Sequence, residues 1–133
     1  MKFIALNGEE ARRILAPLAG NSKTDTSCGV CDIADFLGGG QGWLLVDGVG
    51  LHLLAFVIEK IERANGRELV ISAALQLTPR GGLTEAILPE IERIFGADCD
   101  LMTVHTKRSG LVRKLEKSGY AEAAKVMQKR ITK

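Results

Sequence analysis

The sequence predicts an α/β (α+β) fold in which a mixed, mostly antiparallel central sheet is flanked by helices. Three observations predict it. Asn65-Gly66, the strongest hairpin signal in the chain, joins two strand-like runs. A Gly-rich turn after the second run opens a segment with apolar residues at helical spacing. Another strand-like run and a short helical segment follow, so strands and helices alternate in the second half of the chain.

Composition indicates one globular domain, residues 1–133. The chain has 46% apolar residues and a formal charge of +2, which gives no general argument for a nucleic-acid partner. Basic residues are nevertheless concentrated in 107–133, where the carboxylates are Glu116 and Glu122. Such an end suits an anionic ligand, but it is equally typical of a solvated surface. Without a long apolar run or a signal-peptide pattern, we expect a cytoplasmic protein that does not contact membranes.

The expected elements are bounded by capping and turn residues. Asn7 and Glu10 have the spacing of a capping box, and Gly20 ends the first helix. Ser109 can cap the last helix, and Gly119 suits its C-terminal end. In order, we expect strand 1–6, helix 8–19, a polar loop at 21–27, a short helix within 28–37, strands 42–47, 51–58 and 67–77, a helix from Thr84 to Gly96 kinked or delayed by Pro89, strand 99–106 and helix 110–118.

The turn Thr78-Pro-Arg-Gly-Gly-Leu-Thr84 is the main candidate for a binding site. It follows strand 69–77 and opens a helix, so it presents free backbone N–H groups and the positive end of a helix dipole. Two glycines let the backbone approach a ligand closely. This is a phosphate-binding geometry, although many such connections carry glycine and bind nothing.

The cysteines do not predict a metal site. Cys28-Gly-Val-Cys31 is a single pair, and Cys99 stands apart, whereas structural zinc sites usually need about four ligands. The pair follows a polar loop rather than a strand, which argues against a redox motif. We expect no metal and read these thiols as structural residues.

The order of elements after residue 42 resembles the GCN5-related N-acetyltransferase (GNAT) superfamily. The resemblance covers about 42–131 and is best from Leu75 to Tyr120. The family turn carries Gln/Arg-x-x-Gly-x-Gly/Ala, and Gly82 falls on its middle glycine, with Pro79 and Thr84 on the outer positions. The basic run at 106–120 is similar to compact GNAT-like proteins encoded by phages and prophages.

The resemblance implies a GNAT-like sheet with two splayed parallel strands, 69–77 and 99–106, which hold acetyl-CoA between them. It also implies a last strand after Tyr120, where local composition instead favours helix, and homodimers through sheet edges. Arg108 stands where the family usually has Asn, and Leu115 where it has a Tyr acid. The residues implied in cofactor binding are Leu75, Leu77, Arg80, Gly81, Gly82, Leu83, Thr84 and Arg108.

By this resemblance the chain moves an acetyl group from acetyl-CoA to an amine of a small molecule or a protein. Glu68 and His105 are the candidate catalytic residues, and Glu59 is a weaker one. Glu68 could equally be a solvated strand-end carboxylate. The alternative is a GNAT-shaped protein that has lost catalysis and serves as a binding or structural module. Nucleic-acid binding is disfavoured because the basic C-terminus lacks interleaved aromatic residues.

Overall fold

The computed structural model describes residues 1–18, 21 and 31–132. Within them, five strands form one sheet in the order β1-β2-β3-β4-β5, with β4 and β5 parallel and the other neighbours antiparallel. The predicted fold class is confirmed. The elements are β1 (Lys2–Leu6), α1 (Gly8–Leu15), the 3₁₀ helix η1 (Ala16–Leu18), α2 (Ile33–Gly39), β2 (Gln41–Val46), β3 (His52–Arg63), β4 (Gly66–Gln76), α3 (Leu83–Phe95), β5 (Leu101–Val104) and α4 (Ser109–Lys117).

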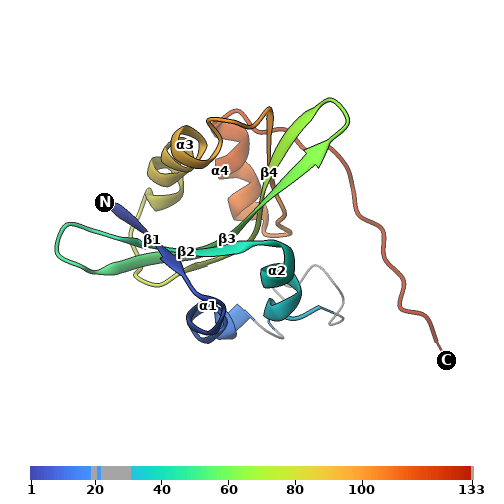
Figure 1. Ribbon diagram of the computed structural model, residues 1–133. Coiled ribbons are helices and arrows are strands. Elements are labelled where there is room, and N and C mark those ends of the chain that lie inside the picture. The colour runs from blue at the N-terminus through green and yellow to red at the C-terminus, as the bar shows by residue number, and fades with distance from the viewer. Residues whose placement is uncertain (19–20, 22–30, 133) are drawn as a thin grey trace.

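Helices cover both faces of the sheet (Figure 1). The helices α1 and α2 lie on one face, and α3 and α4 lie on the other. Alternate residues of β3 serve the two sides: Phe56 packs in the core under α3 and α4, whereas Ala55 and Val57 pack in the core with α1 and α2. The sheet is therefore the middle layer of three, with a separate apolar core on each face.

The hairpin predicted at Asn65-Gly66 is present, and its strands are longer than expected. Strand β3 continues to Arg63 and pairs with β4 along its length. A Cβ on Gly66, whose φ is +153°, would lie 2.6 Å from the Asp100 side chain. The same carboxylate accepts a hydrogen bond from the Arg67 N–H at 2.9 Å. Glycine therefore allows the connection before β5 to pack against the hairpin.

Strands β4 and β5 pair over only four residues each. Their register runs from Glu68–Leu101 to Ile71–Val104, and β4 then continues to Gln76 beside β3 alone. The β3–β4 register shifts at the same level, which leaves Ser72 as an extra residue in β4. Such a bulge bends the strand that contains it. The parallel strands therefore separate beyond Ile71, as the GNAT resemblance implied.

Several predicted helix ends were wrong. Helix α1 ends at Leu15, and a 3₁₀ turn containing Pro17 follows it. The predicted loop at 21–27 and the start of the 28–37 helix lie largely outside the described residues; α2 begins at Ile33 behind the Asp32 cap. The predicted cap Ser109 lies inside α4, whose N-cap is Arg108.

Thr84 does not cap α3 either, because the helix begins earlier than predicted. Gly82 is the N-cap, with φ +72°, and it makes no side-chain capping bond. This left-handed conformation is open to glycine at little steric cost, so the chain enters the helix two residues before Thr84. Pro89 lies within α3, where it has no N–H to donate to the Glu85 carbonyl.

The strand predicted after Tyr120 was wrong. Residues 120–132 form neither strand nor helix, and the register of the sheet ends at β5. Gly119, with φ +94°, terminates α4 as predicted, and Figure 1 shows the following segment leaving the body of the molecule. Within the described part of the chain, the segment pairs with no strand of the sheet, so it forms no ladder of its own. Among the described residues, no helix is long and apolar enough to cross a membrane.

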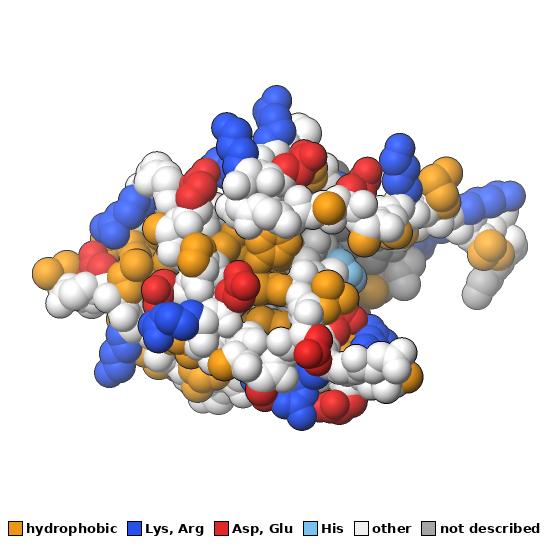
Figure 2. Space-filling model, turned by 90° about the horizontal axis from the view of Figure 1, so that it is seen from above, with side chains coloured by type: hydrophobic (Ala, Val, Ile, Leu, Met, Phe, Trp, Pro, Cys, Tyr) orange, Lys and Arg blue, Asp and Glu red, His pale blue; other side chains and the backbone are white. Residues whose placement is uncertain are grey.

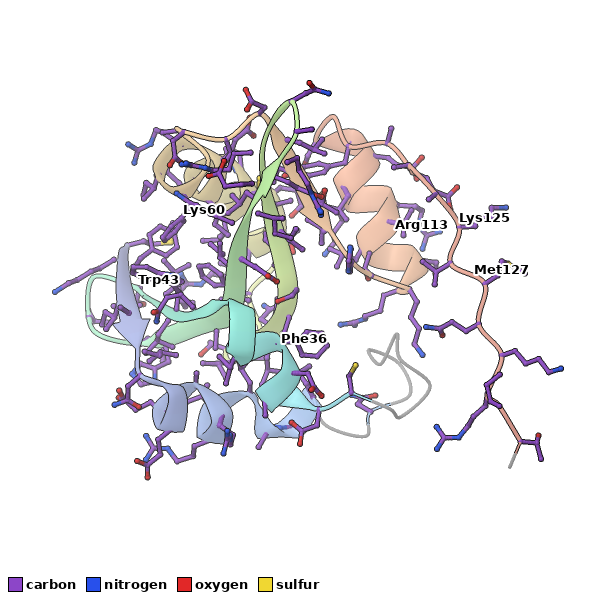
Figure 3. The ribbon with its side chains drawn as sticks, turned by 45° about the vertical axis from the view of Figure 1, so that its right-hand side comes forward. Phe36, Trp43, Lys60, Arg113, Lys125 and Met127 are labelled. Atoms are coloured by element: carbon purple, nitrogen blue, oxygen red, sulfur yellow. The ribbon has the colours of Figure 1, made fainter. Side chains whose placement is uncertain are left out.

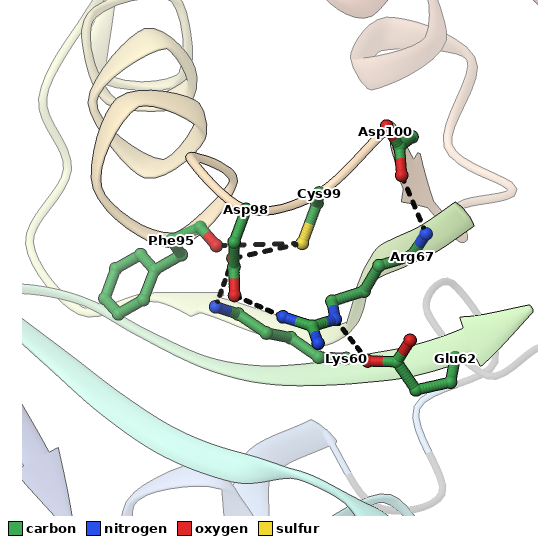
Figure 4. A network of polar contacts seen from close by, with 7 residues as sticks. All are labelled: Lys60, Glu62, Arg67, Phe95, Asp98, Cys99 and Asp100. Atoms are coloured by element: carbon green, nitrogen blue, oxygen red, sulfur yellow. Dashed lines mark hydrogen bonds and ion pairs between the residues drawn. The ribbon is translucent and has the colours of Figure 1, made fainter.

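An ion-pair network ties the β3–β4 hairpin to the end of α3 (Figure 4). Asp98 accepts a hydrogen bond from Lys60 Nζ at 2.8 Å and also pairs with Arg67, which in turn pairs with Glu62. The Cys99 thiol lies within hydrogen-bond distance of the Phe95 carbonyl, and burial raises its pKa. The described part of the chain holds no cluster of ligands suited to a metal ion.

The Asp98 carboxylate should make stability depend on pH. The hydrogen bond from Lys60 lowers its pKa from 3.8 to about 2, so its contribution is full above pH 3.8 and is lost as pH falls toward 2. In denaturant titrations, Asp98→Asn should be less stable than the wild type at pH 6, and the difference should shrink below pH 3.8 and disappear as pH falls through about 2. The pair is exposed, so the effect should be small and decrease with salt. A Lys60→Met variant that kept the full pH dependence would contradict this assignment.

Candidate functional site

A cavity of about 630 Å³ opens where β4 and β5 separate. It lies under α3 and α4, and Figure 2 shows apolar side chains within a hollow near the middle of this face. The buried residues that line the cavity are all apolar: Phe56, Ile71, Leu83, Ile87, Leu88, Ile91 and Leu115. An apolar floor of this size can hold an elongated organic ligand.

The rim of the cavity is polar and basic. Its polar lining residues are Gln76, Thr84, Lys107, Arg108, Ser109 and Lys114. The set contains three cations and no carboxylate. The cavity therefore favours a ligand with an apolar or amide-rich part and an anionic part.

Two helix N-termini meet at this rim. Helix α3 begins after Gly82 and helix α4 after Arg108, and neither N-cap side chain bonds to the helix. Thr84 from the first turn of α3 and Ser109 from the first turn of α4 both line the cavity. The first N–H groups of a helix have no partner within the helix, and they carry its positive dipole end. The two ends together strengthen the case for a bound anion.

Hydrogen bonds and an ion pair fix the loop before α3 to the β2–β3 turn and to the start of β3. Thr78 Oγ1 donates to the His52 carbonyl at 2.7 Å, and Gln76 Nε2 donates to the carbonyls of Thr78 and Arg80 at 3.0 and 3.3 Å. Arg80 Nη2 lies 3.5 Å from Asp47 Oδ2. The pKa of Asp47 is lowered, first by the hydrogen bond from the Leu51 N–H and also by Arg80. The Arg80 side chain therefore holds the loop in place.

Comparison with solved structures identifies the architecture. A protein described as "Putative acetyl transferase" from Pyrococcus furiosus superposes with a TM-score of 0.70 at 15% identity, covering 98% of this chain and 100% of that one. A GNAT family acetyltransferase from Staphylococcus aureus gives 0.57 at 14% identity, covering 98% and 100%. A transcriptional regulator from Bacillus halodurans gives 0.65 at 12% identity, covering 98% and 99%. The chain has a GNAT fold.

Sequence comparison adds no family assignment. No protein-family model matches the sequence, and no curated protein matches it significantly. At these identities, the likeness to solved structures concerns the GNAT fold alone.

The GNAT fold brings most of the expected cofactor residues to one place. Leu83, Thr84 and Arg108 line the cavity, and Arg80, Gly81 and Gly82 form the loop that leads to its rim. The side chains of Leu75 and Leu77 pack instead in the core with α1 and α2. Their neighbours Ala74 and Gln76 line the cavity.

Sequence reasoning missed Ala74, Gln76, Lys107, Leu111 and Lys114, all of which line the cavity. Strand alternation could have found the first two, because residues on either side of Leu75 face the opposite side of the sheet. In the sequence, Lys107 and Lys114 belong to a stretch of basic residues, 107–133, with nothing local to single them out. These side chains reach the same cavity only because α4 lies beside β4 in the folded protein.

Neither candidate catalytic residue lines the cavity. Glu68 accepts hydrogen bonds from Thr103 Oγ1 at 2.5 Å and from Arg63 Nη2 at 2.8 Å. These contacts, the Thr103 one first, lower the pKa of Glu68, which makes the carboxylate a weaker base. His105 is exposed directly after β5 and contributes a favourable charge interaction to Glu68. Both belong to the sheet face opposite the cavity, since Leu69 and Val104 pack on the α3 and α4 side.

Two positions could carry an acid that protonates the CoA thiolate. One holds an apolar side chain and the other a buried ring. Leu115, which stands where the family has Tyr, is 6% exposed in the core. The Tyr120 ring packs against the same core, and burial followed by the charge of Glu92 raises its pKa. The Tyr120 hydroxyl does not line the cavity. Among the described residues, no tyrosine therefore lines the cavity as an acid for the thiolate.

Proposed function

We propose that the protein is an acyl-CoA-dependent N-acetyltransferase that binds acetyl-CoA in the cavity between β4 and β5. The observation that carries this proposal is the meeting of separating parallel strands, an apolar floor and two helix N-termini with a basic rim. The pantetheine arm suits the apolar floor. The pyrophosphate suits the N–H groups from Arg80 to Thr84, and Lys107, Arg108 and Lys114 suit the remaining phosphate charge.

Backbone groups of β4 would orient the cofactor. Beyond Ile71 the edge of β4 that faces β5 is not paired with it, so the main chain on either side of Leu75 can bond to the amides of pantetheine, whereas the Leu77 N–H already bonds to the Leu53 carbonyl at 2.9 Å. The bulge at Ser72 lies at the mouth of this gap. A backbone N–H there can polarise the acetyl carbonyl, which needs no particular side chain.

The acceptor would approach from the face that carries Glu68 and His105. Its uncharged nitrogen attacks the acetyl carbon, a C–N bond forms, the C–S bond breaks, and the thiolate leaves and takes up a proton. Glu68, with its lowered pKa, is suited to holding a cationic amine, whereas His105 is suited to removing the proton. The acceptor is an amine of a small molecule or a protein. Acetyl-CoA as donor is consistent with a cytoplasmic location.

A catalytically degenerate GNAT protein is the second candidate. Leu115 in place of an acid and the hydrogen-bonded Glu68 carboxylate both favour it. One neighbour in the fold is described as a transcriptional regulator, so this architecture is not confined to proteins described as acetyltransferases. Such a protein could retain cofactor binding without turnover.

Calorimetric titration with acetyl-CoA and with CoA separates these candidates. We expect micromolar binding that Ala74→Trp abolishes by filling the cavity, with Ala64→Trp at the exposed hairpin tip as the matched control. The rate of CoA thiol release with a panel of amines should then fall in a His105 variant. It should not depend on Glu68 acting as the base. Binding without turnover by any amine would support the degenerate candidate. Absence of binding to either ligand would reject the acetyltransferase and would mean that the degenerate candidate has also lost its cofactor site.

A further inference from the structure

Ser72 is the residue at which the side chains of strand β4 change faces. Ile71 packs in the core with α3 and α4, and Ala74 lines the cavity on the same side. Ala73 packs instead in the core with α1 and α2, where Phe36 of α2 also lies (Figure 3). Ser72 is the extra residue between Ile71 and Ala73 in the β3–β4 register. It therefore lies at the boundary between the cavity and the opposite face of the sheet.

The Ser72 hydroxyl is buried and has no hydrogen-bond partner among the described residues. Within this part of the chain, its Oγ and the Tyr120 hydroxyl are the two buried side-chain oxygens of which this is true. A buried hydroxyl without a partner destabilises a fold, and a catalytic role is one reason for such a group in a native protein. Ile71, directly before Ser72, lines the cavity, so a ligand bound there can supply the missing partner.

A cofactor that follows β4 from the loop before α3 would bring its reacting end to Ser72. Gln76 and Ala74 line the cavity along β4, and about 13 Å of extended strand separates Gln76 from Ser72. The pairing of β4 with β5 begins again at Ile71–Val104, which closes the gap between the strands at this level. The sulfur at the end of an extended pantetheine arm would therefore lie beside the bulge.

We propose that the Ser72 hydroxyl donates a hydrogen bond to the sulfur of CoA as the thioester breaks. This role for Ser72 rests on the proposed acetyltransferase function. When the amine nitrogen bonds to the acetyl carbon, the electron pair of the C–S bond passes to sulfur, and the Ser72 O–H stabilises the negative charge there. The amine loses its proton to His105, and the thiolate takes up a proton from water. Ser72 keeps its own proton, because a hydroxyl is a much weaker acid than a thiol.

The thiol pKa of bound CoA tests this hydrogen bond without an acceptor amine. A donor to the thiolate favours the charged form, so Ser72→Ala should raise the pKa of the bound thiol by about one unit above its value on the wild type. Ser72→Thr keeps a hydroxyl and should stay close to the wild type, whereas Ser72→Val, of nearly the same shape, should behave like Ser72→Ala. The ultraviolet absorbance of the thiolate, taken as a difference from the ligand-free protein, is followed from about pH 7 to pH 10 at saturating CoA.

Ser118→Ala is the matched control for the titration. Ser118 is exposed at the C-terminal end of α4, and its Oγ donates to the Lys114 carbonyl at 3.2 Å, so this variant should leave the thiol pKa unchanged. A wild type that binds CoA with the same thiol pKa as Ser72→Ala would overturn the role of Ser72 and leave the proposed function standing. A wild type that binds neither CoA nor acetyl-CoA would overturn both.

The stability of the ligand-free protein gives a second test of Ser72. Because its hydroxyl lacks a partner, Ser72→Ala should unfold at a urea midpoint equal to or above that of the wild type. Thr103→Ala is the contrasting variant: Thr103 Oγ1 donates to Glu68 at 2.5 Å, so its loss should lower the midpoint. A clear loss of stability in Ser72→Ala would show that the hydroxyl has a structural partner, which would overturn its role at the sulfur.

Discussion

Gly82→Asp should weaken acetyl-CoA binding by about 10- to 100-fold, whereas Gly82→Asn should weaken it only a few-fold. Gly82 has φ +72°, a conformation that both Asn and Asp tolerate better than other residues with side chains. A Cβ at this position meets no heavy atom within 4 Å, so both side chains fit. The two variants have nearly the same shape and differ by one negative charge placed beside the expected pyrophosphate.

The pair of variants also separates binding from folding. A carboxylate at the N-terminus of α3 interacts favourably with the helix dipole, so Gly82→Asp should be at least as stable as Gly82→Asn in denaturant titrations. Titration calorimetry at low and high salt provides the binding constants. The difference between the variants should shrink with salt because it is electrostatic. Equal affinities at low salt would mean that the pyrophosphate does not lie at this loop.

Phe56→Ala should lower the free energy of unfolding by about 3–5 kcal/mol. Phe56 is fully buried at the centre of β3, and its ring lies edge-to-face with Phe3 at 5.9 Å and with Phe95 at 6.1 Å between centroids. Removing the ring leaves a cavity and loses both aromatic contacts. Since small domains have total stabilities of about 5–15 kcal/mol, this one change should remove a large share.

Urea titration monitored by circular dichroism measures this effect. Val49→Ala is the matched control, since Val49 is 90% exposed and should change stability by less than about 0.5 kcal/mol. Phe56→Leu should fall between the two because it keeps most of the apolar volume. A loss below about 1 kcal/mol for Phe56→Ala would show that the core relaxes around the missing ring.

Features that depend on a few neighbouring residues were predicted well. The Asn7–Glu10 capping box has both its hydrogen bonds, and Asn65-Gly66 connects β3 to β4. Gly119 has the left-handed conformation expected at a helix end. These signals come from backbone geometry and short-range hydrogen bonds, which are largely independent of the rest of the chain.

The first residue of a helix was harder to predict where two nearby residues could act as the N-cap. Thr84 is a good capping residue by type, yet Gly82 takes the N-cap because the loop before it is bonded to the start of β3. The contacts that decide this join Thr78 to His52, which is distant in sequence. Local preference is a weak guide when a long-range contact sets the path of the backbone.

By itself, the sequence determined the succession of strands and helices up to α4, the hairpin and the glycine loop that opens α3, because capping, turn chemistry and apolar spacing act over a few residues. Tertiary structure alone decided where β4 and β5 separate, since this depends on the Ile71–Val104 pair and on the bulge opposite Val57. It also placed Glu68 and His105 on the face opposite the cavity and left the tail beyond Tyr120 without a neighbouring strand. Strand pairing joins residues far apart in the chain, and no local pattern specifies which edges meet.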